Sequence, residues 1–483
     1  DVLHLLPGDG PSVGAPLTAD PRIAGVCFTG STEVARMIER QLAGTAAPDA
    51  MLIAETGGLN AMIVDSTALP EQAVRDMVAS AFRSAGQRCS ALRILYVQKD
   101  VEHKVVTMLK GAMEALTVGD PWALSTDVGP LIDDDALASI SQYCGEMTAK
   151  GRLLAKLEAP GGGRFLPPHI FKVSGIPELE REIFGPVLHV ATFAADELDK
   201  VIADINARGY GLTFGLHTRI DARVQHVLER VHAGNIYVNR NQIGAVVGSQ
   251  PFGGEGLSGT GPKAGGPHYL PRFRKAAGAR SPESAPAASP RPAISEAALP
   301  DPGDWAQRPD RVATLRKLLR GRAADAIAAA ASLDLGPVDL PGPTGEANSL
   351  LLVPRGRVLC LGPDAETLLA QVVQALAAGN AVLAVSADAN AALQPLLGKG
   401  LPLAAEAGEA GEALLRDLSV SVVALAGRAA RQRQVRQMLA SRTGALARFV
   451  TAPIDPLAYV HERSICVDTT AAGGNASLLA AAE

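Results

Sequence analysis

The chain has few cysteines, few aromatic residues and no long apolar run. Its 483 residues include five cysteines, an odd number, and no Cys-x-x-Cys pair. These features argue against a disulfide framework and a structural zinc site, and they are typical of a reducing cytoplasm, where we expect the protein to act. Every apolar stretch of about 18 residues is interrupted by charge, glycine or proline, so we expect no membrane span.

An excess of charge of either sign is also missing. Forty-five basic and fifty acidic residues give a net charge of −5 at pH 7, and no basic block occurs. Nucleic-acid binding therefore has little support. Hydrophobic residues make up 47% and charged residues 20%, which is typical of a globular protein with a well-formed core, and the length allows two or three domains.

Short apolar strands alternate with helices along residues 1–65. We predict a helix from Ser31 and strands at VLHLLP (2–7), GVCFTG (25–30), MLIAE (51–55) and AMIVD (61–65). Strand–helix alternation predicts the α/β class with a parallel sheet. A G-x-G-x-x-G dinucleotide fingerprint is missing after every one of these strands.

The helix from Ser31 begins in a way that suits phosphate binding. Gly30 allows a tight exit from the preceding strand, and Ser31 can cap the helix. The start of a helix offers free backbone N–H groups and the positive end of its dipole. An ordinary capped helix fits the same residues, so this turn alone leaves both interpretations open.

One cysteine, Cys89, lies in the stretch FRSAGQRCSALR (82–93). A thiol reacts as its thiolate, and a neighbouring cation such as Arg88 can lower its pKa. A cysteine that only fills the core is the alternative. Glu55 lies 34 residues upstream, where an apolar strand meets a Gly-Gly turn in LIAETGGLNA. A nucleophile with a separate carboxylate indicates covalent catalysis with general-base help.

The second half begins with a glycine-rich segment, GAVVGSQPFGGEGLSGTGPKAGGPHYL (244–270). Its glycines surround Phe252 and predict a shaped loop over a pocket. Residues 276–303 are rich in Ala, Ser and Pro and indicate a linker. Strand–helix–strand units recur beyond it and predict a second α/β domain, with the cysteines Cys360 and Cys466 as core residues.

Four motifs resemble those of the aldehyde dehydrogenase superfamily, in the same order, over residues 1–275. They are LIAETGGLNA, FRSAGQRCSALR, CFTGSTEVA and EIFGPV. The 244–270 loop resembles the aldehyde-anchor loop of Δ1-pyrroline-5-carboxylate (glutamate γ-semialdehyde) dehydrogenases. The linker, the second domain and the AAGGNAS tail resemble the C-terminal part of the proline utilization A family, bifunctional bacterial proteins that join a flavin-dependent proline dehydrogenase to this dehydrogenase.

The resemblance implies NAD-dependent oxidation of L-glutamate γ-semialdehyde to L-glutamate, the second step of proline catabolism. Cys89 would form a thioester, and Glu55 would activate the water that hydrolyses it. The other implied sites are Thr29, Gly30, Ser31, Glu182 and Phe184 for NAD, Ser90, Gly244 and Ala245 for the substrate carboxylate, and Phe252 for its aliphatic chain. No metal is implied, and FAD would belong only to the proline dehydrogenase part, which we do not find in this chain.

The resemblance also divides the chain. We expect a remnant of the NAD-binding domain (1–65), a catalytic domain (66–243), the anchor loop and return to the nucleotide domain (244–275), the linker (276–303), a degenerate aldehyde dehydrogenase-like, Rossmann-like domain (304–460) and a capping tail (461–483). In the degenerate domain, Val385 stands where the family has its cofactor-binding lysine. The tail from Asp468 to Leu479 is expected to cap the active-site region.

Two departures from the family pattern bear on activity. The oxyanion-hole asparagine of a Pro-Trp-Asn segment and the lysine that grips the adenosine ribose are not found. We therefore expect an N-terminally truncated fragment that is inactive alone, within an active parent that also contains the proline dehydrogenase domain, forms a homo-oligomer and is cytoplasmic or peripheral at the inner membrane. A non-catalytic assembly fragment and an NAD-independent thiol esterase are the alternatives, and a measurement of NAD binding separates the first of these from the dehydrogenase.

Overall fold

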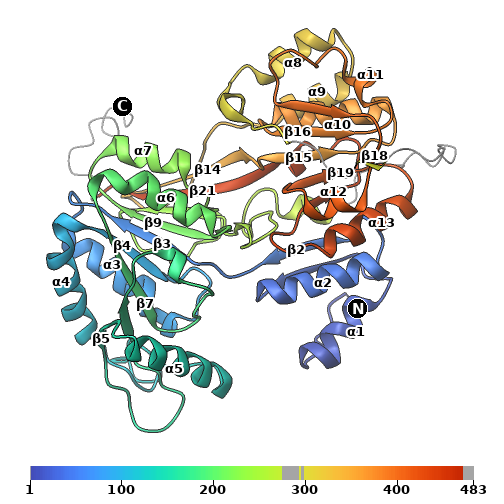
Figure 1. The fold of residues 1–483 in the computed structure, drawn as a ribbon. Coiled ribbons are helices and arrows are strands. Elements are labelled where there is room, and N and C mark those ends of the chain that lie inside the picture. The colour runs from blue at the N-terminus through green and yellow to red at the C-terminus, as the bar shows by residue number, and fades with distance from the viewer. Residues whose placement is uncertain (1, 275–292, 295–298, 471–483) are drawn as a thin grey trace.

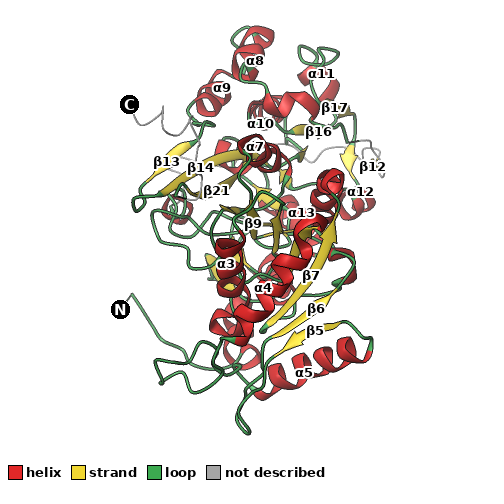
Figure 2. Ribbon diagram, turned by 90° about the vertical axis from the view of Figure 1, so that its left-hand side faces the viewer, coloured by secondary structure: helices red, strands yellow, loops and turns green. Residues whose placement is uncertain are grey.

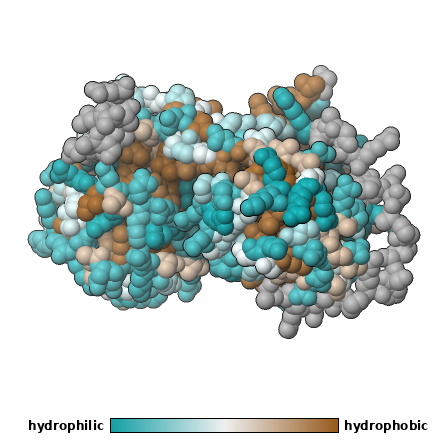
Figure 3. Space-filling model, turned by 90° about the horizontal axis from the view of Figure 1, so that it is seen from above, coloured by the Kyte–Doolittle hydropathy of each residue, from teal (hydrophilic) through white to brown (hydrophobic). Residues whose placement is uncertain are grey.

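The computed structural model describes residues 2–274, 293–294 and 299–470, which form two lobes (Figure 1). Seen from above, the lobes lie side by side, and hydrophilic residues are spread over both (Figure 3). None of the helices in the described part of the chain has the length and apolar character needed to cross a membrane. The α/β class predicted from the sequence is confirmed in both lobes.

A ten-stranded mixed sheet runs through the larger lobe. Its order is β13 (Val338–Leu340), β14 (Glu346–Pro354), β21 (Val460–Asp468), β10 (Asn235–Val238), β9 (Thr213–His217), β3 (Ala61–Val64), β4 (Ile94–Gln98), β7 (Val187–Phe193), β6 (His169–Lys172) and β5 (Leu153–Lys156). The strands from β21 through β6 are parallel, and the pairs at both ends of the sheet are antiparallel. Figure 2 shows β13 and β14 at one end and β5, with α5 beside it, at the other.

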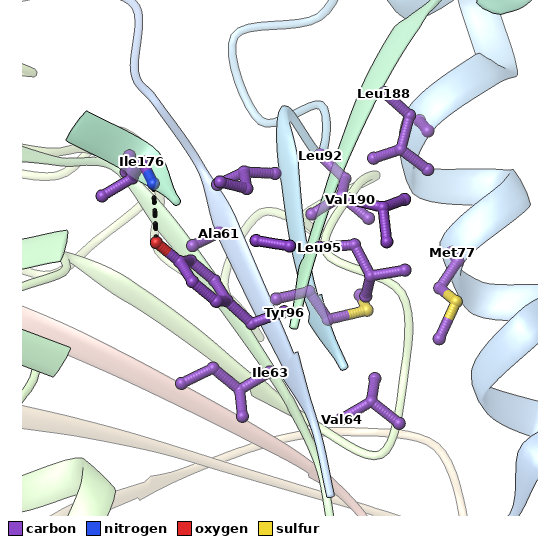
Figure 4. Packing of buried hydrophobic residues seen from close by; sticks show 14 of the residues in the cluster. Ala61, Ile63, Val64, Met77, Leu92, Leu95, Tyr96, Ile176, Leu188 and Val190 are labelled. Atoms are coloured by element: carbon purple, nitrogen blue, oxygen red, sulfur yellow. Dashed lines mark hydrogen bonds between the residues drawn. The ribbon is translucent and has the colours of Figure 1, made fainter. Parts of the chain in front are cut away.

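Helices pack beside the parallel strands, so inner strands such as β3 and β4 are buried at every position, and their sequences are continuous apolar runs. These helices are α3 (Pro70–Phe82), α4 (Glu102–Glu114), α5 (Asp134–Ala149), α6 (Leu198–Ala207) and α7 (Asp221–Arg230). In the core, side chains of β3 and β4 pack with Met77 of α3 and Leu188 of β7 (Figure 4). The hydroxyl of Tyr96 accepts a hydrogen bond from the backbone N–H of Ile176 at 2.7 Å, which satisfies a polar atom inside this apolar cluster.

The N-terminal part forms a small unit of its own. The strand β1 (Gly25–Thr29) pairs in parallel with β2 (Met51–Glu55), and α1 (Ala15–Ala19) and α2 (Thr32–Thr45) accompany them. The helix predicted from Ser31 is confirmed, since the Ser31 hydroxyl accepts from the N–H of Val34 at 3.3 Å. The strand predicted at 2–7 is wrong. Its apolar side chains are exposed, and among the described residues no strand pairs with it, so its pattern alone does not make it a strand.

The smaller lobe contains the predicted second α/β domain. Its sheet is fully parallel, with the order β17 (Leu403–Glu406), β16 (Ala381–Val385), β15 (Arg357–Cys360), β19 (Val422–Ala424) and β20 (Arg448–Val450). Its helices are α8 (Arg311–Leu319), α9 (Ala324–Ala331), α10 (Ala365–Ala377), α11 (Ala389–Leu393), α12 (Glu412–Asp417) and α13 (Ala429–Ala440). Cys360 and Cys466 are buried, as predicted.

Several contacts between the described residues join the lobes. Helix α13 packs on α2, where the buried guanidinium of Arg436 donates to both oxygens of Glu39 at 2.8 Å and to the carbonyl of Ala50 at 2.8 Å. A second connection is formed by β14 and β21, which precede and follow the smaller lobe's sheet in the chain. These two strands pair with each other in antiparallel fashion, and β21 also pairs with β10 of the large sheet. The chain segments that lead into and out of the smaller lobe's sheet are therefore strands of the large sheet.

Residues 461–468 were expected to begin an extended tail, but in the structure they belong to a strand. Residues 460–468 form β21, which pairs with β14 on one side and with β10 on the other, so this segment is an inner strand of the large sheet. Its partners lie more than a hundred residues away along the chain, so no local pattern indicates them. Residues 471–483, which include most of the predicted cap, lie outside the described residues.

Candidate active site

Glu55 and the Thr29–Ser31 turn meet at the carboxyl ends of two parallel strands. Thr29 ends β1, Glu55 ends β2, and the two residues are register partners. The N–H of Gly30 donates to the carbonyl of Glu55 at 3.2 Å. Ligands of open α/β sheets bind at the carboxyl ends of strands, so the structure places the predicted base beside the predicted phosphate turn.

The carboxylate of Glu55 is buried and only partly satisfied. One oxygen, Oε2, accepts from the N–H of Gly254 at 2.9 Å, and the other, Oε1, has no hydrogen-bond partner among the described residues. Burial raises the pKa of Glu55 above its ordinary value of 4.5, while the Gly254 N–H and the charge of Lys263 act in the opposite direction. An unpartnered buried carboxylate oxygen is well suited to accept a proton from a water molecule or substrate.

A buried cation, Lys263, lies behind this carboxylate. Its ammonium group donates to Oδ1 of Asn235 at 2.8 Å and to the carbonyl of Gly253. Burial lowers the pKa of Lys263, whereas the negative charge of Glu55 raises it. Each charge thus favours the ionised form of the other. Neighbouring loop residues contact both groups: the Gly254 N–H donates to Glu55, and the Gly253 carbonyl accepts from Lys263.

Cys89 follows a turn with unusual backbone geometry. Ser84, Ala85 and Gly86 have φ values of 56°, 52° and 64°, a left-handed conformation that costs non-glycine residues about 1–2 kcal/mol each. The amide of Asn60 holds the turn in place by donating to the carbonyl of Cys89 at 2.6 Å. Strain of this kind persists only where the surroundings impose it, and such strain is common at functional sites.

The environment raises the pKa of the Cys89 thiol above its ordinary value of 9.0. Burial is the largest cause, and the negative charges of Glu182 and Glu55 add to it. The expectation that Arg88 lowers this pKa is therefore wrong. Its side chain bonds instead to the Ser84 hydroxyl at 2.9 Å. The negative charges of Glu182 and Glu55 thus both favour the neutral thiol of Cys89.

Glu182 belongs to a buried ion pair that also holds the cysteine turn. Its Oε1 accepts from Nε and Nη2 of Arg93 at 3.1 and 2.9 Å, and its Oε2 accepts from the N–H of Gly58 at 3.2 Å. Arg93 is 1% exposed and also donates to the carbonyls of Gly86 at 2.7 Å and Gly185 at 3.3 Å. One guanidinium thus joins the cysteine turn to the EIFGPV segment.

Four of the five residues predicted to bind NAD are exposed, and the fifth, Glu182, is largely buried in its ion pair with Arg93. The ring of Phe184 is 43% exposed, with the Arg93 guanidinium 5.2 Å from its centroid, and it lines a surface depression of about 1070 Å³. Thr29, Gly30 and Ser31 are exposed at the start of the fourteen-residue helix α2. An exposed aromatic face and an open helix start fit a dinucleotide, and the chain would hold it with these groups.

The predicted substrate residues fall in two places. The buried Ser90 lies under the loop, where its carbonyl accepts from Nε2 of Gln242 at 3.3 Å. Gly244, with φ of 76°, and Ala245 follow Gln242 by two and three residues in the chain and lie near the surface. Phe252 pairs with Ala264 through two backbone hydrogen bonds of 3.0 and 2.8 Å, immediately before the glycines that contact Glu55.

Sequence reasoning assigned no role to Asn60, Arg93 or Lys263. Asn60 and Arg93 lie inside the quoted glutamate and cysteine motifs, and all three side chains are polar groups at positions that are at most 2% exposed. A polar residue in an otherwise buried run is the signal that could have found them. Asn60 bonds to Cys89, Arg93 to Glu182 and Lys263 to Asn235 over separations of 29, 89 and 28 residues, so no local pattern indicates these partners.

A glycine-to-alanine pair tests the packing of the cysteine turn. We expect Gly86→Ala to lower the free energy of unfolding by about 2–4 kcal/mol, because a Cβ there lies 2.1 Å from the carbonyl oxygen of Gly185 and φ is 64°. Gly151→Ala is the matched control, with φ of 70° and no atom within 4 Å of the new Cβ, and should cost about 1 kcal/mol. Urea denaturation of both variants measures the difference, and equal losses would contradict the predicted clash.

The fold and the site define an α/β protein with a candidate cysteine nucleophile and carboxylate base, and comparison with known proteins agrees with them. The profile of the aldehyde dehydrogenase family matches residues 1–276. The chain belongs to this family. It is also 44% identical to the bifunctional protein PutA of Salmonella typhimurium over 99% of this chain and 37% of that protein. It therefore spans little more than a third of that relative.

Solved structures resemble somewhat more than half of the chain. A crystal structure of a mutant of Bradyrhizobium japonicum proline utilization A is 56% identical, with a TM-score of 0.54 over 55% of this chain and 27% of that one. A 1-pyrroline-5-carboxylate dehydrogenase from Thermus, with bound NAD, is 36% identical, with a TM-score of 0.52 over 56% of this chain and 52% of that one. These matches agree with the resemblance seen in the sequence motifs.

Proposed function

We propose that this chain carries the site for NAD-dependent oxidation of L-glutamate γ-semialdehyde to L-glutamate, the second step of proline catabolism. The observation that carries the proposal is the placement of Glu55. Its Oε2 is fixed by the Gly254 N–H, its Oε1 is buried and unpartnered, and its charge reaches the Cys89 thiol. The names of the similar proteins support the choice of substrate.

Each reacting group has a defined task in this proposal. After the Cys89 thiol has lost its proton to water, the thiolate attacks the aldehyde carbon and forms the alkoxide of a thiohemiacetal; loss of hydride from that carbon then converts the alkoxide to the thioester on Cys89. Bound NAD would supply the hydride acceptor. Glu55 takes a proton from water, and the resulting hydroxide attacks the thioester carbonyl, releasing glutamate and the Cys89 thiolate.

The raised pKa of Glu55 suits this task. A general base works best when its pKa lies near the operating pH, and burial moves Glu55 in that direction from 4.5. Arg93 and Asn60 act as positioning residues, because they hold the turn that presents the thiol. Without them the left-handed backbone of that turn would relax.

Substrate and cofactor would be held by separate groups. The backbone N–H groups of Gly244 and Ala245, with Ser90, bind the substrate carboxylate, and Phe252 packs on its aliphatic chain. Backbone donors in a glycine-rich turn form a nest for an anion. Thr29, Gly30, Ser31, Glu182 and Phe184 hold the pyrophosphate, ribose and nicotinamide ring. A proline dehydrogenase domain in the same protein would produce the precursor of this aldehyde, and we propose a homo-oligomer.

Kinetics with two aldehydes test the proposal. We expect the full-length native protein to reduce NAD with glutamate semialdehyde at a kcat/KM about 100-fold or more above that for butanal, which has the aldehyde but no carboxylate. NADH absorbance measures both rates. Similar values for both aldehydes would contradict the substrate, no NAD binding by calorimetry would favour an assembly role, and ester hydrolysis without NAD reduction would favour an esterase.

A further inference from the structure

Both ends of the loop that carries Gly244 and Ala245 are attached to one carboxylate, that of Glu346. Arg240, before the loop, donates through Nη1 to Oε2 of Glu346. Gln250, after the loop, donates through Nε2 to Oε1 of the same residue at 2.7 Å. Glu346 is the first residue of β14, so the attachment comes from a strand of the large sheet that lies about a hundred residues farther along the chain.

A second acceptor repeats this arrangement. The thiol sulfur of Cys466 on β21 lies 2.9 Å from Nη1 of Arg240 and 3.4 Å from Nε2 of Gln250. Cys466 pairs with Asn348 of β14, whose amide also donates to Oε1 of Glu346 at 2.9 Å. Both ends of the loop therefore share the same two acceptors on neighbouring strands.

These contacts are largely removed from water. Gln250 is 2% exposed, and the side chains of Arg240 and Glu346 are 16% and 18% exposed. Charge-assisted hydrogen bonds are stronger than neutral ones, and partial burial reduces screening. The Arg240 guanidinium also lies 5.4 Å from the ring centroid of Tyr237, which limits its freedom to turn away.

The tip of the loop, by contrast, is loosely held. Gly244, Val246, Val247 and Gly248 are exposed. The backbone contacts there are weak or local: the N–H of Gly248 donates to Gly265 at 3.3 Å, and that of Gln250 donates back to Val246 at 2.7 Å. The geometry of the tip therefore depends on its two ends.

We propose that Glu346 is a positioning residue for the substrate carboxylate. It ties together the two ends of the 241–249 segment, so that the Gly244 and Ala245 N–H groups converge on one point before substrate arrives. This inference rests on the proposed anchoring role of those two N–H groups. Fixing a loop in its bound shape lowers the entropy lost on binding and so raises affinity.

Two variants in the full-length native protein test the inference. Glu346→Gln removes the charge, and Gln250→Met removes only one attached end while keeping the ion pair with Arg240. We expect KM for glutamate semialdehyde to rise about tenfold in Glu346→Gln and less in Gln250→Met, with kcat within about twofold. For butanal, which needs no carboxylate anchor, kcat/KM should change less than about twofold.

Hydrogen exchange provides a readout that needs no activity. The amides of residues 244–248 should exchange about tenfold faster in Glu346→Gln than in the native protein. The control is Glu412→Gln, which removes an exposed carboxylate of the smaller lobe, paired with Arg416 within α12, and should leave kinetics and exchange unchanged. Unchanged exchange at 244–248 in Glu346→Gln overturns the inference whatever the substrate is.

The remaining outcomes separate this inference from the proposed function. Equal losses with both aldehydes would assign Glu346 a purely structural role and overturn the inference. A lower KM for the semialdehyde would also overturn it, because Glu346 would then be withholding the Arg240 cation from the substrate. Faster exchange in the variant, with a native protein that does not distinguish the two aldehydes, would instead support the loop attachment and refute the proposed substrate.

Discussion

Replacing Cys89 with alanine should lower kcat for NAD reduction with glutamate semialdehyde by about 10⁴-fold or more in the full-length native protein. The thiol is the proposed attacking group, and none of the other four cysteines belongs to the proposed site. Cys144, Cys360 and Cys466 are buried in cores or sheet contacts, and Cys27 lies on β1. Without the thiol, neither the thiohemiacetal nor the thioester can form.

Two measurements guard this prediction against a folding artefact. Cys144→Ala removes a buried thiol from α5 and should leave kcat within about twofold, with a modest loss of stability. Calorimetry should show that Cys89→Ala still binds NAD, since its side chain is not among the proposed cofactor groups. Retained NAD reduction in Cys89→Ala would disprove the covalent route.

Replacing Glu55 with glutamine should lower steady-state turnover by about 10²–10⁴-fold, the usual contribution of a general base. Glutamine keeps the shape and can still accept from the Gly254 N–H, but it cannot take a proton from water. The thioester should then accumulate. We expect a rapid burst of NADH followed by slow turnover, and an acylated Cys89 that mass spectrometry detects.

The pH dependence gives a second, independent check on Glu55. Only the ionised carboxylate acts as a base, so thioester hydrolysis should be slow below the pKa of Glu55 and should rise as the pH increases through it. Burial raises that pKa, so the rise should occur well above 4.5. Glu55→Gln should lose this dependence.

A matched variant keeps the result specific. Glu366→Gln removes an exposed carboxylate from the first turn of α10 in the other lobe and should keep both the rate and the pH profile of the native protein. A normal rate in Glu55→Gln, or a pH profile unchanged by the substitution, would show that another group activates the water.

Local patterns predicted most of the secondary structure. The apolar runs at 25–30, 51–55 and 61–65 form β1, β2 and β3, because side chains that suit a buried strand lie next to each other in the chain. Ser31 caps α2 because capping needs only residues within one helical turn. The strand expected at 2–7 failed for the opposite reason, since a strand also needs a neighbour to pair with.

The sequence predicted which residues make up the candidate site, but it did not predict how their surroundings shift the pKa of the Cys89 thiol. Cys89 and Glu55 were predicted from the residues around them, and the charge of Glu55 acts on the Cys89 thiol in the structure. The effect expected of Arg88 on the thiol was wrong, because neighbours in the chain need not be neighbours in space. Burial and the charges of Glu55 and Glu182 set the direction of the thiol pKa.

The sequence by itself determined the α/β class, the order of most strands and helices, and the positions of the candidate nucleophile and base. These depend on side-chain periodicity and on short motifs. The tertiary structure alone decided the groups that surround them. It brought Lys263 to the loop behind Glu55, placed Glu346 across the anchor loop, and inserted β21 beside β10. Hydrogen bonds, burial and charge act through space, so contacts between segments far apart in the sequence, such as β10 and β21, appear only after the chain has folded.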